Sequence, residues 1–191
     1  MKPFVGLLLI VALASCRCED PEVIDLGPVP DTIMMSVPYR DGGVYSFRHS
    51  AGQVIHFNAS RESREERTWC EWRCCEYVYK YQVNTTTLRP DYPVFDLGMV
   101  LSSHNNDYPV LHLWVGRSAY YLPMYSADLG GVLYSDSLLV GDRWYREVYK
   151  LPRESMGFSE GPVYPDTLVY NFSEGILRIM MSNDEYYEIE Y

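Results

Sequence analysis

The sequence predicts an all-β, antiparallel fold: a sandwich, barrel or meander of roughly ten strands. From Thr32 onward apolar and polar residues alternate with a period of two, the period of a strand, and no stretch has the period of an amphipathic helix. Turn residues separate these segments at short intervals. The chain also has 18 tyrosines and only 6 phenylalanines. Tyrosine suits a half-buried strand because its ring packs while its hydroxyl reaches water.

Residues 1–15 form a predicted signal peptide. Lys2 supplies the basic start, residues 4–11 supply the apolar segment, and small residues precede Cys16. The apolar segment is about half the roughly 20 residues that a membrane-spanning helix needs. We therefore expect a cleaved leader rather than a permanent transmembrane helix.

The end of this leader, Leu13-Ala14-Ser15-Cys16, resembles the lipobox of bacterial lipoproteins residue for residue. The resemblance implies diacylglycerol on the Cys16 thiol, cleavage directly before it and acylation of the new amine. Two or three acyl chains anchor a protein stably, whereas one does not. The implied product is a lipoprotein held on a membrane of the cell envelope through Cys16. The alternative is an ordinary secretory signal that ends near a cysteine.

Residues 16–31 are predicted to be the lipid anchor and a flexible tether, because they hold several acidic residues and three prolines without apolar periodicity. The acidic residues after Cys16 resemble the surface-export signals of certain Gram-negative lipoproteins. Arg17 is not the aspartate that retains some lipoproteins in the inner membrane, so the resemblance implies the outer membrane. Residues 32–191 are long enough for a single β-rich extracytoplasmic domain.

The first strands of this domain are predicted at residues 43–49 and 53–59, joined by a turn at 50–52. Residues 61–67 include three arginines and three glutamates, so they are predicted to be a solvated loop or a single helical turn. Alternation bounded by turn residues predicts further strands at residues 75–83, 95–101, 110–115 and 118–122. Gly116-Arg117 between the last two predicts a type II′ turn.

The C-terminal third is predicted to hold a hairpin of residues 137–140 and 143–151, a connecting loop at 152–165, and a hairpin of residues 176–181 and 185–191. Gly175, before the last hairpin, is expected to allow a positive φ or close packing. Segments 144–151 and 170–179 resemble the C-terminal part of small β-rich envelope lipoproteins of unknown function. That resemblance implies a shared fold and no shared chemistry.

With Cys16 acylated, four cysteines remain: Cys18, Cys70, Cys74 and Cys75. An even number outside the cytoplasm favours disulfides, with three connectivities. Adjacent Cys74 and Cys75 face opposite ways on a strand, so we expect Cys70 to pair with one of them. Cys18 either holds the tether or stays free. A zinc site is the weaker alternative, because no second ligand pair has finger spacing.

The sequence predicts no enzyme, no cofactor and no metal site. It has no nucleophile elbow, zinc-protease motif, phosphate loop or dinucleotide fingerprint. His56 and His112 fall in apolar strands and are predicted to be satisfied core or wall residues rather than ligands or bases. Acidic residues near 104–107 and 128–136 match no calcium loop. Asn58, Asn84 and Asn171 lie in glycosylation sequons, which matter only in a host that glycosylates.

The formal charge of −10 becomes −11 once Lys2 leaves with the leader. A charge of this sign repels phosphate backbones, so no nucleic-acid partner is expected.

Trp69 and Trp72 follow the charged segment, and an exposed indole there could stack on a sugar or on a partner protein. The alternative is that both cap the core. The leading functional hypothesis is a non-catalytic envelope lipoprotein that binds a protein or glycan partner, or serves a structural role. The second hypothesis is a carrier that encloses a hydrophobic ligand or a lipoprotein in an apolar β-cavity. A hydrolase that uses paired carboxylates is the third.

Overall fold

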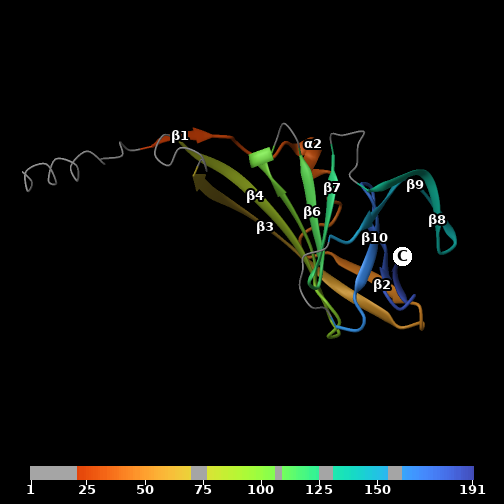
Figure 1. The fold of residues 1–191 in the computed structure, drawn as a ribbon. Helices are drawn as coiled ribbons and strands as arrows, with labels where there is room; N and C mark the ends of the chain where they lie inside the picture. The colour runs from red at the N-terminus through yellow and green to blue at the C-terminus, as the bar shows by residue number, and fades with distance from the viewer. Residues whose placement is uncertain (1–20, 70–76, 106–108, 125–130, 155–160) are drawn as a thin grey trace, which may run out of the picture.

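A computed structural model describes residues 21–69, 77–105, 109–124, 131–154 and 161–191, whose strands form one sheet (Figure 1). Eleven strands follow one path of antiparallel neighbours, in the order β7-β6-β5-β4-β3-β2-β12-β11-β10-β9-β8, and β1 pairs in parallel with β4. The predicted all-β antiparallel fold is therefore confirmed. The leader and Cys16 lie outside the described residues.

The strands are β1 (Glu22–Asp25), β2 (Val44–His49), β3 (Val54–Trp69), β4 (Tyr77–Pro90), β5 (Leu97–Ser102), β6 (Val110–Val115), β7 (Ser118–Pro123), β8 (Leu133–Val140), β9 (Arg143–Pro152), β10 (Pro165–Asn171), β11 (Gly175–Met181) and β12 (Tyr186–Glu190). Two short helices accompany them, α2 (Asp31–Met34) and η1 (Ser103–Asn105).

The sheet consists of two meanders, which join where the last strand, β12, pairs with β2. β2 to β7 form one meander, β8 to β12 form the other, and β12 pairs with β2 with Ile189 opposite Phe47. The predicted hairpins around residues 50–52, 116–117, 141–142 and 182–184 are all present. Gly116 has a φ of 57°, as the predicted type II′ turn requires at its first position.

Strand β10 lies partly in the predicted loop and was not among the strands predicted from alternation. Its residues Leu168, Val169, Tyr170 and Asn171 are all buried, so both faces of the strand are covered. A strand buried on both faces reads as a continuous run instead of an alternation. The period-two pattern therefore could not reveal it.

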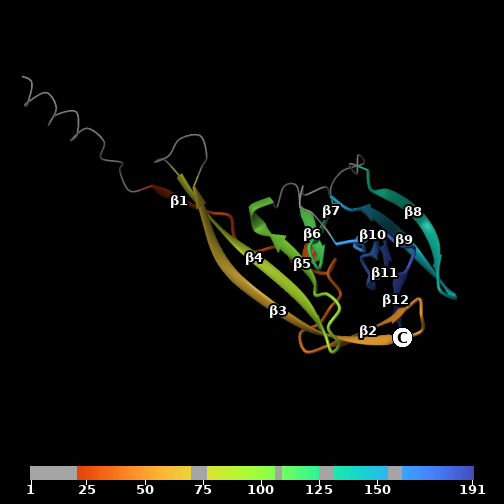
Figure 2. The ribbon, with the colours of Figure 1, turned by 60° about the horizontal axis from the view of Figure 1, so that its bottom comes forward.

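The sheet curls, and its inner face forms the main core (Figure 2). At the β7 edge, the Glu154 amide, in the chain after β9, donates to the Ala119 carbonyl at 2.9 Å. Aromatic rings fill the interior, and Phe47 and Phe57 pack edge to face with centroids 5.4 Å apart. The largest fully buried side chains are Tyr39, Tyr120, Tyr170, Phe47, Phe57, Leu88, Leu97, Met99, Leu111, Leu113, Leu122 and Leu151.

The segment between β1 and β2, which contains α2, packs against this core. Val29, Val37 and Tyr39 are buried within it. Two hydrogen bonds fix the segment to the C-terminal meander: the Tyr170 hydroxyl donates to the Ser36 carbonyl, and the Ile176 amide donates to the Tyr39 hydroxyl, both at 2.6 Å. The first strands and the last strands are therefore joined through the inside of the curl.

The prediction that residues 16–31 form a flexible tether is wrong for the part that the structure describes. β1 pairs with β4, with Ile24 opposite Tyr79, and the Leu26 amide donates to the Lys80 carbonyl at 2.9 Å. Val29 is buried and its amide donates to Gln82 Oε1 at 3.0 Å. The prolines break the periodicity of this segment without freeing it, because extended backbone can still pair and bury single apolar side chains.

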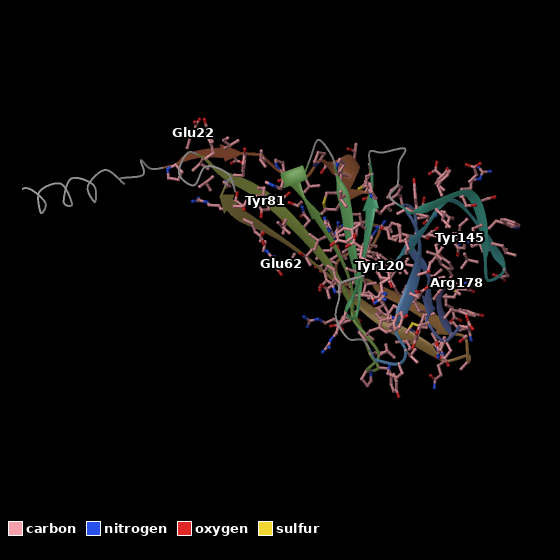
Figure 3. The ribbon with its side chains drawn as sticks, in the orientation of Figure 1. Glu22, Glu62, Tyr81, Tyr120, Tyr145 and Arg178 are labelled. Carbon is pink, nitrogen blue, oxygen red and sulfur yellow. The ribbon has the colours of Figure 1, made fainter. Side chains whose placement is uncertain are left out.

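The prediction that residues 61–67 form a loop or helical turn is also wrong. They lie in the 16-residue strand β3, which pairs with β4 from Phe57 to Trp69. Figure 2 shows the ends of β3 and β4 reaching out from the curled body with β1, and Figure 3 places Glu62 and Tyr81 on this extension.

A ribbon with water on both sides can carry charge on both faces, so dense charge does not exclude a strand there. Lys80 Nζ pairs with Glu65 at 2.7 Å and with Asp25 at 3.2 Å, and Arg64 pairs with Glu66 at 2.7 Å. Exposed ion pairs of this kind each contribute little to the stability of the fold, so the backbone hydrogen bonds between β3 and β4 hold the extension together.

Candidate binding surface

The β8–β9 hairpin carries the most prominent exposed apolar surface of the described residues. Leu133, Tyr134, Leu139 and Trp144 are 66%, 49%, 45% and 68% exposed. No other described strand pair exposes as many large apolar side chains. Isolated exposed apolar residues need no explanation, but this hairpin exposes four, of which Leu139 and Trp144 share a face beside its tip, while Leu133 and Tyr134, adjacent on β8, project to opposite faces. We call these four residues the hairpin patch.

The turn sequence fixes the geometry of the hairpin patch. Gly141 has a φ of 62° and opens the two-residue turn, so Val140 stands opposite Arg143 and Leu139 opposite Trp144. Side chains directly opposed across a ladder share a face of the sheet. Leu139 and Trp144 therefore project together beside the tip of the hairpin.

Near the tip, the face opposite Leu139 and Trp144 is packed, which holds these two side chains in place. Val140, Tyr145 and Val148 form a second buried cluster with Val169 of β10 and Leu177 of β11. Val169 and Leu177 directly follow the inward-facing Leu168 and Ile176 in their strands. Successive strand residues face opposite sides, so this cluster lies on the outer face of the sheet. The hairpin residues Val140, Tyr145 and Val148 thus pack on the outer face of β10 and β11.

Charged groups also contribute to the contact between the hairpin tip and the neighbouring strands. The Arg143 guanidinium lies over the Tyr191 ring, 4.6 Å from its centroid, and 3.7 Å from the Glu174 carboxylate. Arg178 of β11 pairs with Glu188 of β12. Figure 3 shows Tyr145 and Arg178 on this side of the molecule.

A hollow of about 310 Å³ lies between the hairpin tip and strands β2 and β12, lined among others by Arg48, Arg143, Glu188 and Glu190. Two of its carboxylates are paired with arginines, Glu190 with Arg48 and Glu188 with Arg178. A Cβ at Gly141 would lie 2.5 Å from Glu188 Oε1, so the tip sits tightly on β12. The hollow is therefore best understood as part of the joint that supports the hairpin patch.

The predicted stacking residues lie at the far end of β3. Trp69 closes that strand with its backbone opposite Val78, and Trp72 lies outside the described residues. Stacking by these two residues therefore stays a prediction. Cys18, Cys70, Cys74 and Cys75 also lie outside the described residues, so the predicted disulfides stay predictions as well.

Sequence reasoning named Trp144 among the four tryptophans but gave its stacking prediction to Trp69 and Trp72. Arg146, Val148 and Lys150 alternate with Trp144 in the sequence, but Val148 is buried beside Tyr145 and Glu147 has a φ of 52°, so the alternation does not continue through β9. No local pattern therefore marks Trp144 as exposed, and only its place opposite Leu139 follows from the turn. Trp114, by contrast, covers Gly98, where its indole occupies the space that a Cβ would need.

One serine, one histidine and one aspartate come together on the outer surface without forming a catalytic triad. Ser46 Oγ lies 2.8 Å from His56 Nδ1, but Asp91 Oδ1 accepts from the backbone amide of His56 at 3.1 Å and not from its ring. A triad needs the carboxylate on the second ring nitrogen to orient the base. His56 is exposed, so the predicted core or wall position is wrong for this residue, although its ring has a partner in Ser46.

His112 is half-buried on β6 and packs edge to face with Tyr121, at a centroid distance of 4.6 Å. Burial lowers its pKa, which keeps the ring neutral at neutral pH. Its position agrees with the predicted wall residue.

Comparisons with protein-family models, with curated proteins and with solved structures find no match to this chain. Within the ranges that the structure describes, no three His, Cys, Asp or Glu side chains are grouped so that they could hold a metal ion. The same ranges contain no helix with the length and apolar character to cross a membrane.

Proposed function

We propose that the chain is a lipoprotein of the outer membrane, anchored through Cys16, which acts as a non-catalytic binding module for a protein partner. The hairpin patch is the observation that carries the binding proposal. Leu139 and Trp144 project side by side from a hairpin whose other face is packed. A rigid tryptophan beside aliphatic side chains has the composition of an interface hot spot.

The chemistry of the hairpin patch favours a protein partner over a glycan. Two of its four members are leucines, and Leu133 and Leu139 offer a sugar no hydrogen bond. Protein interfaces bury such aliphatic and aromatic groups at their centre.

The packing of the inner face favours surface binding over the carrier hypothesis. Tyr39, Tyr170 and Phe57 fill the described interior and contact one another through the core cluster. Their hydroxyls are also hydrogen-bonded to the backbone: the Tyr39 hydroxyl accepts from the Ile176 amide, and the Tyr170 hydroxyl donates to the Ser36 carbonyl. A carrier needs a continuous apolar space for its ligand, whereas these side chains occupy the centre of the curl.

Photo-crosslinking of the full chain in cells tests this proposal. We expect a benzophenone amino acid in place of Trp144 to give an adduct of defined, higher mass in the membrane fraction. The same amino acid in place of Val44, an exposed residue at the start of β2, is the matched control and is expected to give none. Absence of an adduct at position 144, or equal adducts at both positions, would contradict binding through the hairpin patch.

A further inference from the structure

The first described strand begins at the outer end of the β3–β4 extension. β1 pairs in parallel with β4, with Glu22 opposite Tyr77, the first residue of β4. β3 ends at the same place, with Trp69 opposite Val78. Figure 1 and Figure 2 both show β1 at one extreme of the molecule, beside the outer ends of β3 and β4. We call this end, which contains Glu22, Val23 and Tyr77, the tip of the extension.

The proposed anchor is close to the tip along the chain. Cys16 precedes Glu22 by six residues, and an extended chain spans at most about 3.6 Å per residue, so the two lie within about 22 Å of each other. Strand β4 runs from Tyr77 to Pro90, about 43 Å at 3.3 Å per residue. An acyl chain on Cys16 therefore keeps the tip near the lipid, while the far end of the same strand lies beyond its reach.

The extension is fixed to the curled body, so the position of the tip sets the position of the body. β5 pairs with β4 over Val83–Leu88, and β1 takes the place beside β4 further out, over Tyr77–Lys80. After β1 the chain follows β4 back toward the core. The Val29 amide donates to Gln82 Oε1 at 3.0 Å, and Val29 is itself buried in the core. The chain is thus held along β4 from the tip to the core.

The chemistry of the tip suits the boundary between lipid and water. Val23 and Tyr77 are exposed apolar side chains at this end. Tyrosine is enriched at membrane–water interfaces because its ring is apolar and its hydroxyl is polar. The sides of the extension differ, because Glu62, Arg64 and Glu65 are exposed there. The tip is therefore better suited to contact with lipid than the charged sides are.

We propose that the tip of the extension rests on the lipid surface of the membrane, with Val23 and Tyr77 among the headgroups, and that the extension holds the curled body away from that surface. The inference rests on the proposed function, because it needs the anchor at Cys16. It also places the hairpin patch, since Figure 1 and Figure 2 show the β8–β9 hairpin at the opposite extreme from β1. The patch then meets its partner protein on the aqueous side.

Photo-crosslinking to lipid tests the contact. A benzophenone amino acid replaces Tyr77 in the full acylated chain, reconstituted in vesicles of phosphatidylethanolamine and phosphatidylglycerol. One exposed aromatic side chain then takes the place of another, which leaves the pairing of β1 with β4 intact. We expect phospholipid adducts, detected as an increase in the mass of the peptide that contains position 77.

The same amino acid in place of Tyr92 is the matched control. Tyr92 follows Pro90, at the other end of β4, and is 60% exposed against 37% for Tyr77. If lipid touched both ends of the strand, position 92 would be labelled at least as well as position 77. We expect several-fold fewer phospholipid adducts at position 92. No adduct at position 77, or equal adducts at the two positions, would overturn the proposal.

Lengthening the chain between Cys16 and β1 tests whether the short segment holds the tip in place. An insertion of about 20 Gly and Ser residues between Asp20 and Pro21 adds a flexible linker that no longer confines the tip. We expect the protein to stay on the vesicles while phospholipid adducts at position 77 fall several-fold. An unchanged yield of adducts would contradict the role of the short segment.

The mass of the N-terminus, measured on the same purified protein, separates this inference from the proposed function. If Cys16 is acylated and position 77 gives no phospholipid adduct, the inference fails while the proposed anchor stands. If Cys16 carries no acyl chain, the anchor and the inference both fail. Acylated Cys16 together with adducts at position 77, and several-fold fewer at position 92, supports both.

Discussion

Gly175→Ala is expected to lower the free energy of unfolding by about 2–5 kcal/mol, from about 1–2 kcal/mol of backbone strain and about 1–3 kcal/mol of overpacking. Gly175 has a φ of 87° at the start of β11, where an L side chain is strained. An added Cβ would also lie 2.5 Å from the Tyr39 hydroxyl. Tyr39 cannot yield easily, because it is fully buried and accepts a hydrogen bond from Ile176.

Gly52→Ala is the matched control for this prediction. Gly52 has a similar φ of 94°, and an added Cβ there would meet no atom within 4 Å. The Gly52→Ala variant is expected to lose only the free energy of unfolding that corresponds to backbone strain, about 1–2 kcal/mol. Urea unfolding of both variants and the wild type measures the difference. Equal losses in the two variants would show that the contact between Tyr39 and Gly175 is not tight.

Raising the pH above about 10 is expected to destabilise the protein by about 1.4 kcal/mol per pH unit for each fully buried tyrosine of this kind. Burial raises the pKa of Tyr39 and Tyr170 above the ordinary value near 10. Between pH 10 and these raised values, the unfolded chain releases protons that the folded chain retains. Stability is therefore complete below pH 10 and falls as the pH rises.

Tyr170→Phe separates the contribution of one tyrosine. At pH 8 the variant is expected to lose about 1 kcal/mol, because the hydrogen bond to the Ser36 carbonyl is gone. Above pH 10.5 its stability should fall less steeply than that of the wild type, by about 1.4 kcal/mol per pH unit. Denaturant midpoints from pH 8 to pH 12 measure the slope. Tyr92→Phe, at an exposed turn residue, is the control, and an unchanged slope in Tyr170→Phe would contradict this account.

Local patterns in the sequence predicted the hairpins well, because a turn type follows from the residues at the turn. Gly116-Arg117 and Gly141-Asp142 each place a glycine at the position that needs a positive φ. Gly175 was predicted to allow a positive φ or close packing, and the structure shows both. Each of these predictions depends on a few neighbouring residues.

The errors concern residues whose environment is set by distant parts of the chain. The charged residues 61–67 form a strand because β4 offers a long partner, and residues 62–65 are exposed on both faces of β3. Residues 21–31 pack because Lys80 and Gln82, more than 50 positions away, accept hydrogen bonds from the backbone amides of Leu26 and Val29. Neither partner can be read from the segment itself.

The candidate site could be predicted in part. The position of Trp144 opposite Leu139 follows from the predicted turn, but the exposure of both follows only from the strand order, which places β8 last in the described sheet. Likewise, no local pattern predicts that the hairpin tip leans on β12 through Gly141 and Glu188.

The mass of the mature N-terminus, measured from membrane fractions of the wild type and of Cys16→Ser, tests the anchored binding module most directly. We predict that the wild-type N-terminus begins at Cys16 and carries two or three acyl chains, while Cys16→Ser is uncleaved or released from the membrane. An unmodified wild-type N-terminus in the soluble fraction would contradict the anchor. The protein would then be an ordinary secreted one.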